Sequence, residues 1–132
     1  MDSLQVRTGQ ISLRILDDNE EERGIFKFNP EDIESAKTIV NLQQELAEKQ
    51  ADLQEREKYC ETPEQKVALM SEAVQYFRGL VDNCFGEGSS DIVFGNNNTL
   101  SMFDDFFNGI MPYYEKASKR RMQKYRKPKT NK

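Results

Sequence analysis

The sequence predicts an α+β protein that is mainly α, with a short N-terminal antiparallel β-hairpin or meander, a long helical hairpin and a C-terminal helix. Two patterns predict this fold. Over roughly the first thirty residues apolar side chains alternate with polar ones, the period of a half-buried strand. Beyond them apolar residues recur every three or four positions, the period of an amphipathic helix. A chain of 132 residues supports one core, so residues 1–115 are interpreted as a single domain.

Strands are expected between about residues 4 and 28. Apolar positions fall two apart in "ISLRILDD" and again in "GIFKFNP": Ile11, Leu13, Ile15, Phe26 and Phe28. Leu4 and Val6 suit a first short strand that turns at Thr8-Gly9. The acidic run "DDNEEE" is expected to be a solvated hairpin loop, because it lacks the mid-loop Gly and the distal Glu of a calcium-binding EF-hand loop.

A first long helix is expected over about residues 30–60. Asn29 is a suitable N-cap and Pro30 a suitable first helical residue. One narrow apolar stripe keeps heptad spacing along it: Ile39, Leu42, Leu46, Leu53 and Cys60. The other positions are mostly polar, so this helix should project from the body and needs a partner helix to cover its stripe.

The partner helix is expected over residues 63–85. Thr62 and Gln65 have the form of a capping box before it, and Gly86 is a suitable C-cap after it. Its apolar positions alternate in spacings of three and four: Val67, Met70, Val74, Phe77, Val81 and Cys84. An antiparallel hairpin of the two helices would hold Cys60 and Cys84 on the order of 30 Å apart, too far for a disulfide.

A loop holding at most one helical turn, "DIVF", precedes a closing helix over about residues 99–115. One heptad-like stripe of this helix is interpreted as core: Leu100, Phe103, Phe107, Ile110 and Tyr114. Met102, Phe106 and Tyr113 form a second apolar line beside it and are the candidate partner-binding residues. The alternative is a central helix that the other elements wrap. Gly109 and Pro112 predict a kink or break.

Charge divides the chain into two parts. Nine of its 19 Lys and Arg residues lie in residues 116–132. Residues 1–115 contain the other ten together with all 23 acidic residues, so their net charge is −13. Part of the basic segment suits the negative end of a helix dipole, and "YRKPKTNK" is expected to be disordered. Six basic residues are candidates for an electrostatic contact with the acidic body or for self-association: Lys119, Arg120, Arg121, Lys124, Arg126 and Lys127.

Catalysis is not expected, and neither is a cofactor or a metal. The chain has no His, the commonest general base and metal ligand. The adjacent carboxylates Asp17-Asp18 and Asp104-Asp105 should point apart, and "GEGSSD" lacks the Lys of a phosphate-binding loop. No apolar run approaches the 18 or so residues of a membrane span, and "MDSLQVRTGQ" lacks the form of a signal peptide. An intracellular protein is expected.

The order of elements and several short motifs resemble a family of tail assembly chaperones from long-tailed bacteriophages. The motifs are "RGIFKFNP" at residues 23–30, "FG" at residues 85–86 and 94–95, and "KYRK" at residues 124–127. The resemblance implies a non-enzymatic role in the cytoplasm of the infected bacterium and absence from the mature virion. Such chaperones coat the tape-measure protein, a long apolar helical chain, and help recruit the major tail protein. Many copies on one tape measure imply self-association.

Two other function classes fit the same charges. A small phage-encoded inhibitor could use its acidic surface to imitate nucleic acid and block a host defence nuclease. A nucleic-acid-binding protein could use the basic segment as an arm, although the acidic body would repel phosphates over most of its surface.

Overall fold

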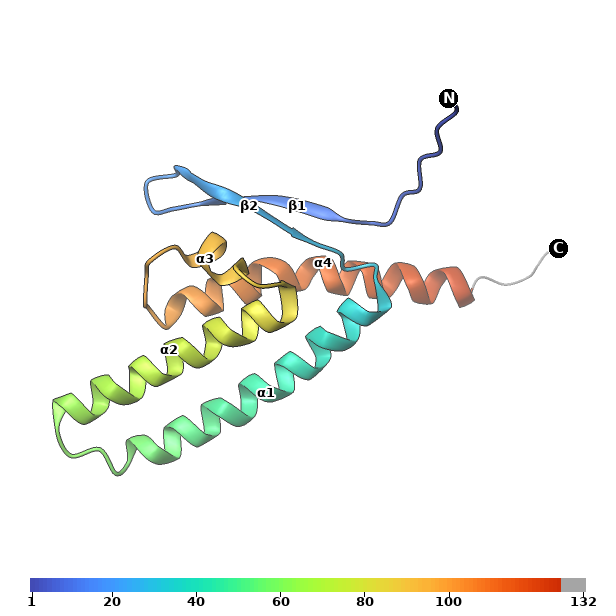
Figure 1. Cartoon of the computed structure of the whole chain (residues 1–132). Helices are drawn as coiled ribbons and strands as arrows, with labels where there is room; N and C mark the ends of the chain where they lie inside the picture. Colours follow the sequence, from blue (N-terminus) through green and yellow to red (C-terminus); the bar gives the residue numbers. More distant parts are fainter. Residues whose placement is uncertain (127–132) are drawn as a thin grey trace.

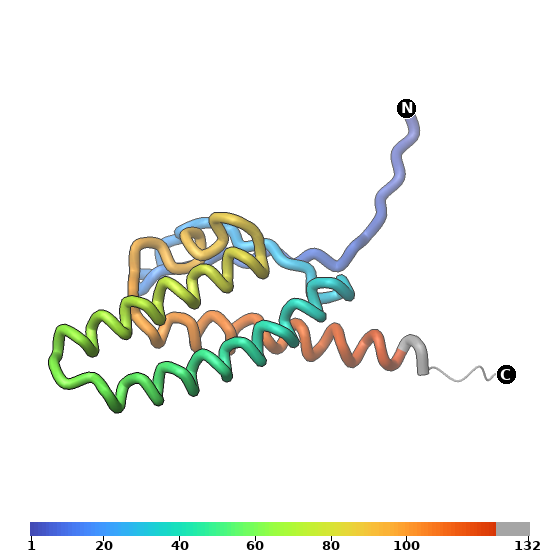
Figure 2. The backbone as a smooth tube through the Cα atoms, turned by 60° about the horizontal axis from the view of Figure 1, so that its bottom comes forward, coloured from blue at the N-terminus to red at the C-terminus, as the bar shows by residue number. Residues whose placement is uncertain are grey.

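The computed structural model describes the backbone of residues 1–126 and the side chains of residues 1–123. Figure 1 shows its elements in chain order, β1 (Ile11–Leu16), β2 (Glu22–Phe28), α1 (Ile33–Glu57), α2 (Pro63–Phe85), α3 (Ser89–Phe94) and α4 (Ser101–Arg126). The fold is α+β and mainly α, as the sequence predicts. Figure 2 shows α1 and α2 lying side by side for most of their length.

The β-hairpin follows the predicted alternation. β1 and β2 pair antiparallel, with Leu13 opposite Phe26 and Ile11 opposite Phe28. Phe26 and Phe28 are buried, while the alternate residues of β1 are half-buried. The acidic loop between the strands is a tight turn in which Asp17 Oδ1 accepts hydrogen bonds from the N–H groups of Asn19 (2.8 Å) and Glu21 (3.0 Å). One face of the hairpin therefore covers the helices.

The expected first strand around Leu4 and Val6 is absent from this structure. Residues 1–10 form no strand, and Leu4 and Val6 are 88% and 71% exposed. Gly9 does turn the chain, with a φ of +92°, and the Asn29 side chain fixes the turn by donating a hydrogen bond to the Thr8 carbonyl at 2.9 Å. The residues before this turn lead away from the body (Figure 1).

Helix α1 begins later than the sequence predicts. Asp32, and not Asn29, is its N-cap, because the Asp32 carboxylate accepts the Ser35 N–H at 2.9 Å. Asn29 instead accepts the N–H of Glu31 at 3.0 Å, which makes "NPED" a turn. The expectation of Pro30 as the first helical residue is therefore also wrong, and Pro30 is a buried residue of this turn.

Helix α2 has the predicted ends. The Gln65 N–H donates to Thr62 Oγ1 at 3.1 Å, and the Thr62 N–H donates to Gln65 Oε1 at 3.2 Å, which completes the capping box. Gly86 ends the helix with a φ of +113°, a conformation that favours glycine.

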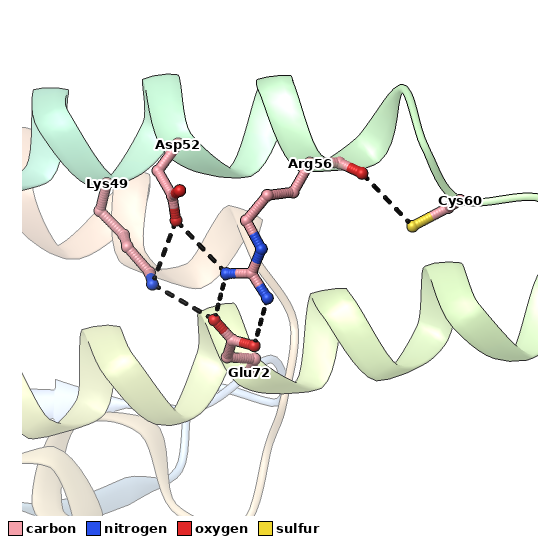
Figure 3. Close-up of polar contacts among 5 residues, drawn as sticks. All are labelled: Lys49, Asp52, Arg56, Cys60 and Glu72. Atoms are coloured by element: carbon pink, nitrogen blue, oxygen red, sulfur yellow. Dashed lines mark hydrogen bonds and ion pairs between the residues drawn. The ribbon is translucent and has the colours of Figure 1, made fainter.

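The distal half of the α1–α2 hairpin is joined by charge. Figure 3 shows Glu72 of α2 accepting hydrogen bonds from Arg56 at 2.5 and 2.8 Å and from Lys49 at 3.3 Å, with Asp52 beside both cations. Apolar contact is sparse there, and the helix-stripe residues Val67 and Met70, expected to be covered, are exposed. Cys60, at the hairpin turn, and Cys84 are free thiols.

The loop around α3 is tied to α2 and β2. Arg78 of α2 donates to the carbonyls of Gly95 and Asn97, both at 2.6 Å, and Arg23 of β2 donates to the Phe94 carbonyl at 3.3 Å. Asp82 accepts both the N–H and the hydroxyl of Ser90, at 2.8 and 3.0 Å. The "RG" and second "FG" motifs of the sequence therefore meet in space, as structural contacts.

Helix α4 is continuous through Pro112, so the expected break does not occur. Asn108, whose carbonyl loses its partner to the proline ring, is exposed, and so are Gly109 and Pro112. Water can therefore satisfy that carbonyl. The helix extends past residue 115 to Arg126, and the rest of the stretch expected to be disordered, residues 127–132, lies outside the described residues.

Candidate binding grooves on either side of helix α4

The first groove, here called the hairpin groove, lies between β1 and α4 and has a volume of about 520 Å³. Four consecutive residues of β1, 13–16, line one side. Met102, Phe106 and Tyr113 of α4 all line the other, so the structure brings the three predicted partner-binding residues into one site. Arg14, Asp18, Arg23 and Asp105 also line it and give it a mixed charge.

Phe106 contradicts its predicted role as surplus apolar surface. It is 8% exposed and lies edge-on against Phe26, Phe85 and Phe94 at centroid distances of 5.3, 5.7 and 5.6 Å. The β-hairpin and α3 cover this line of α4, so the alternative of a wrapped central helix is correct for Phe106. Met102 and Tyr113 are half-buried and leave apolar surface at the groove.

The second groove, here called the helical groove, lies between α1, α2 and the first half of α4, with a volume of about 370 Å³. Its apolar lining comes from all three helices and from Leu100, which directly precedes α4: Leu46, Leu53, Ala73, Phe77, Leu100, Phe103 and Phe107. The side chains of Leu46, Leu53 and Phe107 are half-buried, and Leu100 is 40% exposed. Gln50, Gln54 and Asp104 supply its polar lining, so Asp104 is its only charged lining residue among those described.

Sequence reasoning assigned the residues of the helical groove to core stripes. The signal that could have identified them is their spacing: Leu46 and Leu53 are seven residues apart, and so are Leu100 and Phe107. Two heptad lines on different helices cover each other only where the helices meet along the whole stripe. In this structure the close contact is instead between the buried Phe77 of α2 and the buried Phe103 of α4, whose ring centroids are 5.2 Å apart. The residues of the two lines are therefore only partly buried.

The basic residues divide between internal contacts and solvent. Arg120 binds the Glu31 carboxylate through Nε (3.0 Å) and Nη2 (2.6 Å), and Arg121 donates to the Pro30 carbonyl at 3.0 Å. Lys119 is exposed. The predicted contacts of Lys124, Arg126 and Lys127 lie outside the described side chains. Arg120 and Arg121 therefore bind the protein's own turn before α1.

The titratable groups near α4 are in structural positions. Burial raises the pKa of the Tyr114 phenol, and its 2.8 Å hydrogen bond with Ser35 of α1 partly opposes the shift. Burial, with a smaller effect of Glu45, raises the pKa of the Cys84 thiol, which keeps it protonated at neutral pH. Among side chains 1–123 no three His, Cys, Asp or Glu lie close enough to hold a metal ion.

These features define the chain as a small, mainly helical α+β protein with a groove of mixed charge on one side of its closing helix and an apolar groove on the other. Residues 21–132 match DUF6673, described as a family of unknown function, and the chain belongs to this family. No curated protein and no solved structure matches the chain. None of the helices described here has the length and apolar character needed to cross a membrane.

Proposed function

We propose that this protein is a non-enzymatic tail assembly chaperone of a long-tailed bacteriophage, which holds an apolar helix of the tape-measure protein and helps recruit the major tail protein. The observation that carries the proposal is the helical groove, an open apolar site built from three helices. The motif resemblance indicates the tape-measure protein as the client, and the helical groove is the surface proposed to bind it. The position of the site differs from the predicted line of Met102, Phe106 and Tyr113.

The dimensions of the helical groove suit a helix. Residues seven apart on a helix are separated by about 10.5 Å along its axis, which is close to the diameter of a helix with its side chains. Leu46 and Leu53 on α1, with Leu100 directly before α4 and Phe107 on α4, therefore offer paired ridges to a client helix. A client with apolar residues at i, i+3 or i+4, and i+7 would place one stripe between them.

The net charge of the chain also supports this function. Residues 1–115 carry a net charge of −13, which keeps a complex with an apolar client soluble. The helical groove itself has Asp104 as its charged lining residue, so client binding should depend little on salt. A nucleic-acid mimic would behave in the opposite way, because its binding energy comes from charge.

The test is co-expression with the tape-measure protein of the same phage, followed by measurement of the tape-measure protein in the soluble fraction and of peptide affinity by calorimetry. Leu53→Asp and Leu100→Asp should each weaken binding of a tape-measure helix by roughly tenfold or more, because each places a charge in the apolar contact. Val40→Asp is the matched control, since Val40 is 63% exposed on α1 and does not line the groove.

Circular dichroism of each variant separates lost binding from lost folding. Equal solubilisation by the Leu53→Asp, Leu100→Asp and Val40→Asp proteins, all folded, would contradict the assignment of the helical groove. Tight binding to a basic nuclease that falls steeply with salt would favour the inhibitor instead.

A further inference from the structure

The outer edge of β1 is open next to the hairpin groove. Within residues 1–126 the sheet has two strands, so one edge of β1 pairs with β2 and the other pairs with nothing. Alternate residues of an antiparallel strand direct their N–H and C=O groups to each side, and an unpaired edge accepts an additional strand. Residues 13–16 of this strand also line the groove, so an added strand would lie over its opening.

The same chain contains a segment with strand character and no partner. Residues 3–8 alternate polar and apolar side chains, and their two apolar members, Leu4 and Val6, are 88% and 71% exposed. Figures 1 and 2 both show this segment leading away from β1 and from the helices. It therefore displays two apolar side chains that its own protomer does not cover.

The turn at Gly9 holds the segment away from its own β1. Gly9 has a φ of +92°, and a Cβ added there would overlap the Glu31 side chain, so the turn is packed against the start of α1. The hydrogen bond from Asn29 to the Thr8 carbonyl fixes the same turn. Folding residues 3–8 back onto β1 of the same chain would break both contacts, whereas pairing with another copy would keep them.

We propose that residues 3–8 of one copy add as an antiparallel strand to the open edge of β1 in a second copy, and that the exchange is reciprocal. In a reciprocal exchange a two-fold axis relates the two copies, so each copy gives a strand and accepts one. The contact is strand addition to a sheet edge, a common mode of peptide binding. It uses the hairpin groove and so is independent of the function proposed for the helical groove.

Side-chain direction and the lining of the hairpin groove together fix the register of the exchange, because Leu13 and Ile15 line the groove and Ile11 does not. Residues directly opposite each other in an antiparallel pair point to the same face. Leu13 and Ile15 face the helices, so Leu4 must lie opposite Ile15 and Val6 opposite Leu13 for both to enter the hairpin groove beside Met102 and Tyr113. In this register Gln5 lies opposite Arg14, on the solvent face. A shift of one residue would expose both apolar side chains.

Oligomeric state is the first measurement. The 132-residue chain should sediment as a dimer of 15.4 kDa protomers, and Leu4→Asp and Val6→Asp should each weaken the dimer by at least roughly tenfold. Ser3→Asp and Gln5→Asp add the same charge to the opposite face of the same segment and should leave the dimer intact. All four residues are exposed in the protomer, so none of these changes should unfold it. A monomeric wild-type chain, or a dimer that Leu4→Asp leaves intact, would overturn the proposal.

Cross-linking tests the register and the exchange. In a background of Cys60→Ala and Cys84→Ala, a Leu4→Cys chain mixed with an Ile15→Cys chain should form a mixed cross-linked dimer with a short bismaleimide. A Gln5→Cys chain mixed with the Ile15→Cys chain should cross-link much less, because its side chain points to the other face. A chain carrying both Leu4→Cys and Ile15→Cys that closes on itself at monomer mass would show that the segment folds back onto its own β1, against the proposal.

Discussion

Glu72 of α2 forms ion pairs with two residues of α1. Its carboxylate accepts hydrogen bonds from Arg56 and Lys49, which lie two helical turns apart on α1 (Figure 3). The hydrogen bond from Arg56, followed by that from Lys49, lowers the pKa of Glu72 from its ordinary value of 4.5 to about 2. Single side chains of this kind also join other elements, as Arg78 does for the loop after α3.

The shifted pKa of Glu72 predicts a pH-dependent contribution to stability. A carboxyl group whose pKa is lower in the folded state stabilises that state fully above the unfolded pKa and loses the effect as pH falls through the folded pKa. Glu72→Gln should therefore lower the melting temperature at pH 7, and the difference from wild type should shrink between pH 4.5 and pH 2. Thermal unfolding followed by circular dichroism measures both quantities.

Glu57→Gln is the control for that experiment, because Glu57 lies on α1 and makes no ion pair among the described residues. Its effect on the melting temperature should be small at each pH. A Glu72→Gln deficit that stayed constant from pH 7 to pH 2 would contradict a role for the charged carboxylate.

At the scale of elements, two glycines differ in whether their position requires a glycine. Gly95 follows α3 with a φ of +60°, and a Cβ there would lie 3.2 Å from the Cδ and Nη1 atoms of Arg23. Gly79 lies within α2, and a Cβ there would meet nothing within 4 Å. The first glycine lets the α3 loop approach β2, while the second only adds freedom to the unfolded chain.

This contrast predicts changes of opposite sign. Gly79→Ala should raise the free energy of unfolding by roughly 0.5–1 kcal/mol, because alanine reduces the conformational entropy of the unfolded chain and suits a helix. Gly95→Ala should lower it by about 1 kcal/mol or more through backbone strain and crowding of Arg23. Urea denaturation of the two variants gives both values, and a shared sign would show that the surroundings of one glycine adjust more freely than this packing allows.

At the scale of the whole molecule, α4 is the element that joins the others. Phe106 contacts Phe26 of β2, Phe85 of α2 and Phe94 of α3, and Tyr114 bonds to Ser35 of α1. One helix therefore carries the core contacts of the hairpin on one side and of the helical pair on the other. The hairpin groove and the helical groove lie beside α4, next to these core contacts.

Phe106→Ala should therefore destabilise the entire fold in a single transition. The loss expected for a buried Phe is about 3–5 kcal/mol, from lost burial and the cavity left behind. Asp105→Ala, at the exposed neighbouring position, should change the free energy of unfolding by no more than about 0.5 kcal/mol. Chemical denaturation followed by both circular dichroism and tyrosine fluorescence checks this prediction. Full stability of the Phe106→Ala protein would contradict a core role for Phe106 and support the surface role that the sequence pattern predicts.

Local chemistry explains which parts of the fold the sequence determined. The capping box of Thr62 and Gln65 and the C-cap at Gly86 depend on residues a few positions apart, and α2 begins and ends as predicted. The alternation in "GIFKFNP" likewise specified which face of β2 is buried. At "NPED", two residues compete for the same N-cap role, and pattern alone could not choose Asp32 over Asn29.

The tertiary structure decided which apolar line of α4 is covered. Phe106 and Phe107 belong to neighbouring lines of similar hydrophobicity, and the position of the β-hairpin buries the first while the second stays half-buried at the helical groove. The same holds for Arg120, whose partner Glu31 lies 89 residues earlier in the chain. Periodicity indicates which side chains should be buried, because burial of apolar surface is favourable whichever element provides the contact. Which element supplies the cover depends on contacts between residues far apart in the chain, and only the folded arrangement specifies those.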